Sequence, residues 1–160
     1  MRPIVTLHRQ GFVVIGIQVR TVNRDEMHPG TARIPGLWAR WANVAADMPP
    51  RTDQKLYAVY ADYESDHLGP YSLTIGYAVS PDTATPADMS RVVVPSGRYA
   101  VVTTRRGPMP AIVQEAWQRV WTVSEAELGG RRAYTVDYEV YDERSRNPAE
   151  AEVDINLCVF

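Results

Sequence analysis

The chain is almost without cysteine and lysine. Cys158 is the single cysteine and Lys55 the single lysine among 17 basic residues. One cysteine excludes an intramolecular disulfide and favours a reducing, cytoplasmic setting. No long hydrophobic run is present near the start, since the stretch 12–17 is broken by Gly16 and is too short to span a bilayer. The net charge of −2 provides no basic surplus, so we expect neither direct nucleic-acid binding nor membrane association.

Motifs for metals, phosphates and nucleophilic catalysis are also missing. His8, His28 and His67 are scattered and show no metal-ligand spacing. The pair Gly129-Gly130 is a bare turn and not a phosphate-binding loop. The sequence has no Gly-x-Ser-x-Gly elbow, and Cys158 has no nearby histidine. We therefore expect no metal and no cofactor.

The chain does contain two similar successions of elements. Its 160 residues predict one domain, 1–160, large enough for a real core. The order strand, helix, strand, strand occurs twice, which predicts pseudo-repeats at about 10–80 and 90–160. The predicted elements are a strand at 12–19, a helix at 34–47, strands at 55–63 and 71–79, then a strand at 96–102, a helix at 108–123 and strands at 134–142 and 153–159.

These elements predict an α+β fold of tandem duplicated strand-helix-strand-strand modules. An antiparallel sheet with its two main helices on one side agrees with the apolar alternation of segment 71–79. If Trp38 is aligned with Trp117, Tyr60 falls at the position equivalent to Glu139. A two-fold arrangement would then bring one tyrosine and one glutamate to related places, and we expect a ligand cleft near this pseudo-two-fold axis.

Segment 134–142 combines acidic and aromatic residues. One set of alternate positions, Tyr134, Val136, Tyr138 and Val140, predicts a core face. The other set comprises Thr135, Asp137, Glu139 and Tyr141. A carboxylate with tyrosine two residues away suits a pocket that stacks an aromatic cation and neutralises its charge.

Four segments, in order, resemble GyrI-like small-molecule-binding domains, which share the fold of AraC- and BmrR-type effector-binding domains. They cover nearly the whole chain and include Tyr-Ala-Val-Tyr-Ala-Asp-Tyr from position 57 and Glu-Ala-Trp-Gln-Arg-Val-Trp from position 115. The other two are Pro-Ser-Gly-Arg-Tyr-Ala-Val from position 95 and Asp-Tyr-Glu-Val-Tyr-Asp from position 137, and residues 152–157 fit the family's last strand.

The resemblance implies a stand-alone member, of the kind also encoded in mobile gene cassettes, that binds cationic, aromatic or amphipathic compounds. It would sense or sequester such ligands or be linked to transcription regulation, and a homodimer or a regulator would be its protein partner. The family's cleft carboxylate corresponds to Glu139. The aromatic lining implied by the resemblance comprises Trp38, Tyr60, Tyr71, Trp117 and Tyr141.

Three alternatives remain open. Some GyrI-like proteins hydrolyse electrophilic cyclopropane drugs, which would give Glu139, Tyr60 and Tyr141 catalytic roles. The family's founding member implies a gyrase-modulating interaction protein instead. A strand glutamate can also be simply solvated, and tryptophans at helical spacing can be core residues.

Overall fold

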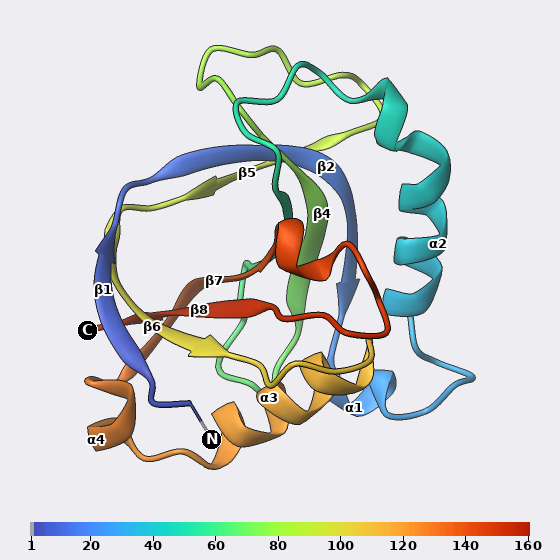
Figure 1. Cartoon of the computed structure of the whole chain (residues 1–160). Helices are drawn as coiled ribbons and strands as arrows, with labels where there is room; N and C mark the ends of the chain where they lie inside the picture. The colour runs from blue at the N-terminus through green and yellow to red at the C-terminus, as the bar shows by residue number, and fades with distance from the viewer. Residues whose placement is uncertain (1) are drawn as a thin grey trace.

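The computed structural model describes residues 2–160 and contains one antiparallel sheet of eight strands (Figure 1). The strands are β1 (Val5–Arg9), β2 (Phe12–Thr21), β3 (Leu56–Ala61), β4 (Tyr71–Val79), β5 (Ser90–Val94), β6 (Gly97–Thr103), β7 (Arg132–Tyr141) and β8 (Asp154–Val159). The helices are α1 (Asn23–Glu26), α2 (Ile34–Val44), α3 (Ala111–Thr122) and α4 (Glu125–Leu128), with 3₁₀ turns η1 (Ala45–Asp47) and η2 (Glu143–Ser145).

All six predicted strands and both main helices are found close to their predicted positions. Helix α2 ends at Val44 and continues as the 3₁₀ turn η1, before two prolines that cannot extend a helix. Strands β1 and β5 were not predicted. They form the two edges of the sheet, where a strand pairs on one side only and needs no strongly apolar pattern.

The strand order is β1-β6-β8-β7-β3-β4-β2-β5, which places β7 and β3 at the centre of the sheet. Strands β1 and β2 are consecutive in the chain but lie toward opposite edges, and the same holds for β5 and β6. The sheet therefore curves into a ring, with α2 and α3 outside it (Figure 1). No helix among residues 2–160 is long and apolar enough to cross a membrane.

Both main helices cover the outer face of this curved sheet. Helix α2 packs Leu37 and Trp41 into a core cluster with residues of β2, β3 and β4. Helix α3 packs Ala116 and Val120 into a cluster with residues of β6 and β8. The register aligns Ala58, Glu139 and Ile155 across β3, β7 and β8, so the residues beneath both helices share one face. The predicted α+β fold, with two main helices on one side of an antiparallel sheet, is confirmed.

The inner face is an aromatic core. Tyr138 lies 5.5 Å from Tyr99 and 5.3 Å from Phe12, measured between ring centroids. Val136 and Val140 are buried in the same cluster, as predicted. Tyr134 was predicted on this face, and that prediction is wrong. The pairing of β7 shifts register between Arg132 and Asp137, and Tyr134 adopts a left-handed φ of 52° that removes it from the strand's alternation.

Candidate functional site

A pocket of about 870 Å³ lies on the outer face, between the walls formed by α2 and α3. Strands β3 and β7 contribute its central residues, and the segment after β2 and the loop after β3 close its sides. Seven aromatic side chains line it: Trp38, Tyr60, Tyr63, Tyr71, Trp117, Trp121 and Tyr141. The pocket therefore combines the size of a drug-sized ligand site with walls rich in aromatic side chains.

The carboxylate of Glu139 lines this pocket from β7, in the middle of the sheet. Glu139 is only 2% exposed. Oε2 accepts hydrogen bonds from the Tyr60 hydroxyl and the Trp117 indole N–H, both at 2.7 Å, and Oε1 accepts one from the Tyr141 hydroxyl at 2.6 Å. Ala58, its direct neighbour on β3, is small, so the adjacent strand does not cover the carboxylate with a large side chain.

Burial and hydrogen bonding act on this carboxylate in opposite directions. Burial raises the pKa of Glu139 above its ordinary value of 4.5, and the three hydrogen bonds lower it again in part. Burial, together with the nearby charge of Glu139, also raises the pKa values of Tyr60 and Tyr141 far above the usual range. The two hydroxyls therefore remain protonated donors at neutral pH, and a charged Glu139 has no formal cation beside it.

Every residue predicted for the ligand site lines this one pocket. The predicted set is Trp38, Tyr60, Tyr71, Trp117, Glu139 and Tyr141. These residues come from α2, β3, β4, α3 and β7, so the fold brings together positions up to 103 residues apart in sequence. The alternative that tryptophans at helical spacing are core residues holds for Trp41, which is 7% exposed and packs between α2 and the sheet.

Sequence reasoning missed several lining residues. Trp121 lies one helical turn after Trp117, a spacing that indicates a shared helix face, and its ring stacks on His67 with 6.5 Å between centroids. Tyr63 follows a left-handed residue, Asp62, whose φ of 51° could not be foreseen from its neighbours. This turn ends β3 and is followed by the loop that carries His67.

A second pocket carboxylate, Glu26, holds the start of α2. Its Oε2 accepts hydrogen bonds from the Thr21 hydroxyl and the Arg33 amide, and its Oε1 accepts one from the Ile34 amide at 3.0 Å. These backbone amides are left without partners by the first turn of a helix. The charge of Glu26 is thus partly balanced by the helix N-terminus. It fixes α2, and with it Trp38, relative to the sheet.

A buried ion pair borders the pocket. Arg132 Nη2 lies 2.6 Å from Asp137 Oδ2, with the two side chains 7% and 0% exposed. The same oxygen accepts the Tyr63 hydroxyl, and Oδ1 accepts the Cys158 amide. The Arg132 guanidinium carbon lies 4.3 Å from the centroid of the Tyr134 ring. Because Asp137 neutralises Arg132, this cation adds little positive charge to the pocket.

The charges lining the pocket are therefore unbalanced toward negative. Arg132 is paired and Glu26 is partly compensated by the start of α2, so Glu139 remains the carboxylate that has neither a cation nor a helix N-terminus beside it. Within residues 2–160, no three His, Cys, Asp or Glu side chains gather as a metal-binding group. Chemically, the site can hold a positive charge next to Glu139 and stack its apolar parts on aromatic rings.

Comparison with known proteins agrees with this architecture. The family model Cass2, described as integron-associated effector binding protein, matches residues 4–159. YobU of Bacillus subtilis (strain 168) is 32% identical over 147 residues, which cover 90% of this chain and 89% of YobU. The transcriptional regulator BrlR of Pseudomonas aeruginosa is 28% identical over 154 residues, which are 96% of this chain but only 53% of BrlR. The chain thus spans about half the length of that regulator.

Two solved structures are similar over nearly the whole chain. The integron cassette protein VCH_CASS2, from the mobile metagenome of Vibrio cholerae, superposes with a TM-score of 0.79 at 31% identity, covering 99% of this chain and 97% of that protein. SAV2435, solved bound to tetraphenylphosphonium, gives a TM-score of 0.76 at 17% identity, covering 99% and 94%. At this low identity, the second likeness concerns the fold.

Proposed function

Because the chain belongs to the Cass2 family of integron-associated effector binding proteins, we propose that it binds cationic, aromatic or amphipathic compounds in the pocket around Glu139. The proposed ligand-binding residues are Glu139 and five aromatic neighbours: Trp38, Tyr60, Tyr71, Trp117 and Tyr141. A small effector-binding protein of this kind would sense or sequester drug-like compounds. Its kinship with the transcriptional regulator BrlR supports a link to transcription regulation.

One observation carries the proposal: a carboxylate that is 2% exposed receives three neutral hydrogen bonds and no cation. A buried carboxylate is stable when it is paired with a charge or surrounded by donors. The three donors stabilise the buried Glu139 carboxylate in the absence of a ligand but leave its negative charge uncompensated. A ligand cation would supply the missing charge.

The walls select the type of cation. A delocalised or arylated cation is weakly hydrated, so it loses less hydration free energy on entering the pocket than a primary ammonium does. Each ring that faces the cation adds roughly 0.5–2 kcal/mol of cation–π attraction. SAV2435, which shares the fold, was solved with such a cation, tetraphenylphosphonium. Aromatic walls also accept many shapes, so we expect broad specificity within this charge class.

Direct binding tests the proposal. Tetraphenylphosphonium should quench the tryptophan fluorescence, because Trp38, Trp117 and Trp121 line the pocket. Triphenylphosphine oxide, a neutral compound with similar rings, should bind more weakly. Absence of saturable binding by tetraphenylphosphonium and by a rhodamine dye would refute the proposal.

Hydrolysis is the second candidate function. It is favoured by the direct contact of the Glu139 carboxylate with two tyrosine hydroxyls, because a carboxylate and a hydroxyl donor could serve as base and acid. Tyr60 or Tyr141 would donate the proton. Incubation with an electrophilic cyclopropane compound, followed by mass spectrometry, separates the two functions. Product formed over many turnovers, and lost in Glu139→Gln, would favour hydrolysis, whereas unchanged compound would favour binding alone.

A further inference from the structure

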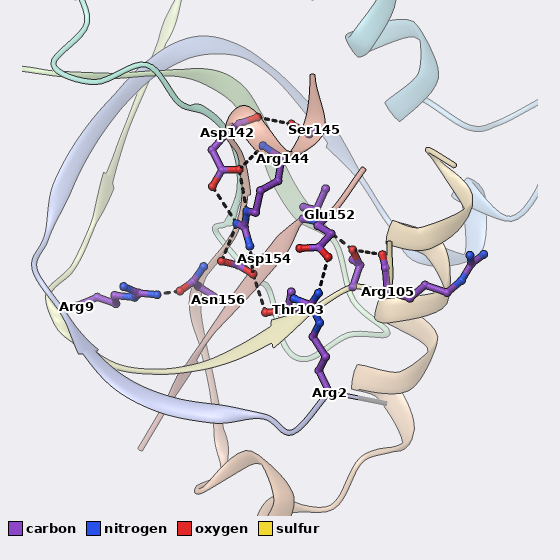
Figure 2. Close-up of polar contacts among 12 residues, drawn as sticks. Arg2, Arg9, Thr103, Arg105, Asp142, Arg144, Ser145, Glu152, Asp154 and Asn156 are labelled. Carbon is purple, nitrogen blue, oxygen red and sulfur yellow. Dashed lines mark hydrogen bonds and ion pairs between the residues drawn. The ribbon is translucent and has the colours of Figure 1, made fainter. Parts of the chain in front are cut away.

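A second hollow opens on the other face of the sheet, inside the ring. Its volume is about 200 Å³, and its lining includes Arg9, Phe12, Tyr57, Tyr138 and Asn156. We call this space the inner hollow. Residues of β7 alternate between the two faces, so Glu139 faces the pocket between the helices while Tyr138 faces inward. Figure 2 shows Arg9 reaching from the wall of the ring into this interior, toward Asn156.

The carboxylates around the inner hollow already accept hydrogen bonds from protein donors. Asp142 accepts hydrogen bonds from Arg144 Nε and Nη2, both at 2.9 Å. Asp154 accepts Arg144 Nη2 at 3.0 Å and the Thr103 hydroxyl at 2.7 Å (Figure 2). A third acid nearby, Asp53, accepts the Tyr57 hydroxyl at 2.7 Å. These acidic groups are therefore engaged by protein donors, with a single guanidinium joining two of them.

The donors that face the inner hollow, in contrast, are not used up. Arg9 donates from Nε to Asn156 Oδ1 at 3.3 Å. Across residues 2–160, its two Nη atoms, the Lys55 ammonium, the Asn156 side-chain N–H₂ and the Tyr138 hydroxyl have no hydrogen-bond or ion-pair partner. Tyr138 is 4% exposed and Asn156 1% exposed. Since both line the hollow, the little surface they retain faces it.

Both residues are buried as a whole, but their polar atoms keep some access to the hollow, since Arg132 Nε is the fully buried side-chain nitrogen without a partner among residues 2–160. Two donors that open onto one small hollow, beside an arginine with free N–H groups, favour an acceptor in that hollow. The positive charge of Arg9 is close enough to lower the pKa of Tyr138, which burial raises to about 12. Arg9 and the Tyr138 hydroxyl thus act on the same small space.

Aromatic rings form the remaining wall. Phe12 lies 4.9 Å from Tyr57 and 5.3 Å from Tyr138 between ring centroids. The volume of the hollow equals that of about seven liquid waters, which suits a small molecule and excludes a drug-sized one. An occupant would need acceptor atoms at one end for the donors, and a thin apolar body for the rings.

We propose that the inner hollow binds a small planar organic carboxylate, with its oxygens held by Arg9, Tyr138 and Asn156 and its flat body against Phe12 and Tyr57. This site is separate from the pocket around Glu139 and has the opposite charge preference. Its occupant would not compete with a cation for space, because the sheet lies between them.

Benzoate is the test ligand, titrated into the whole isotope-labelled protein and followed by NMR. We expect shifts of the Asn156 side-chain amide and the Tyr138 ring, with the Trp117 indole unaffected, and the same shifts when tetraphenylphosphonium is present. Cyclohexanecarboxylate, which is not flat, and inorganic phosphate, which has no apolar body, should bind more weakly.

Variants decide which groups are responsible. Arg9→Gln should weaken benzoate binding by roughly tenfold or more, because a hydrogen bond to a charged group is lost. Tyr138→Phe keeps the ring and should weaken it less, and Arg40→Gln, at an exposed arginine of α2, should leave it unchanged. An unchanged melting temperature verifies the fold of each variant, and Tyr138→Phe decides alone if Arg9→Gln is unstable.

Three results would overturn the proposal: no saturable benzoate shifts, shifts at Trp117 instead of Asn156, or equal benzoate affinity in Tyr138→Phe and Arg9→Gln compared with the parent protein. Tighter binding of phosphate than of benzoate would also overturn it, since the rings would then contribute nothing. None of these results bears on cation binding by the other pocket, so the two proposals fail independently.

Discussion

Glu139→Gln isolates the charge of the pocket from its shape. Glutamine is nearly isosteric with glutamate, and its carbonyl oxygen can still accept the Trp117 indole N–H that Glu139 Oε2 accepts now. Its amide nitrogen would face a tyrosine hydroxyl, which can rotate to become the acceptor. We therefore expect the variant to fold and to keep the aromatic walls in place.

The magnitude follows from Coulomb's law. A ligand charge centred about 5 Å from the carboxylate, at an effective dielectric constant near 20, is attracted by about 3 kcal/mol. Losing 2–3 kcal/mol of this attraction corresponds to roughly 30- to 150-fold weaker binding. A neutral ligand of the same shape has no such term, so its affinity should change less than about threefold.

The assay is a pair of titrations on each protein, one with tetraphenylphosphonium and one with triphenylphosphine oxide, followed by tryptophan fluorescence. Glu125→Gln is the matched control, because it removes the same charge from an exposed position on α4. We expect Glu125→Gln to behave like the parent protein with both ligands. Equal weakening of the cation and the neutral oxide by Glu139→Gln would refute the charge argument.

Four further predictions concern Glu139 and the other acidic groups of the site. Because burial raises the pKa of Glu139 above 4.5, cation affinity should fall as the pH is lowered through that raised value. Tyr141→Phe removes a donor to the carboxylate, so it should raise this pKa further and shift the loss of affinity to a higher pH. Binding titrations at several pH values measure both effects. By linkage, ionisation of Glu139 should destabilise the fold as the pH rises through the same raised pKa, a dependence that Glu139→Gln should abolish. Asp137→Asn would leave Arg132 buried without its counter-charge and should lower the free energy of unfolding by about 3–5 kcal/mol in urea denaturation, whereas an unchanged midpoint would contradict the pairing. Glu26→Gln should cost about 1 kcal/mol by weakening the cap of α2, measured in the same way, and a loss confined to ligand affinity would instead assign Glu26 to binding.

The sequence predicted the central part of the fold well because its signals are local. Alternation in 153–159 and helical spacing in 108–123 predict a strand and a helix, and both are present as β8 and α3. Tyr60 and Glu139 fall at equivalent positions in the proposed alignment, and the structure shows that their side chains are hydrogen-bonded. The duplication itself and the role of these residues in ligand binding remain predictions.

What could not be predicted depends on long-range pairing. The edge strand β1 is held by its register with β6, whose paired residues lie 88 to 96 positions later in the chain. Tyr134 departs from the predicted alternation of segment 134–142 because of a bulge in β7. Local preferences do not encode this bulge, since tyrosine rarely adopts a positive φ. The cap formed by Glu26 spans a loop, and its partners are backbone amides that carry no residue-specific signal.

The alternation of β7 has a consequence for how this protein can change. Neighbouring positions such as Tyr138 and Glu139 belong to separate compartments, so replacing one leaves the chemistry of the other compartment nearly untouched. Substitutions during evolution could therefore broaden or narrow the range of ligands bound on one face of β7 while the site on the other face is conserved. A single-residue insertion in this strand would do the reverse, since it would exchange the contents of both chambers at once.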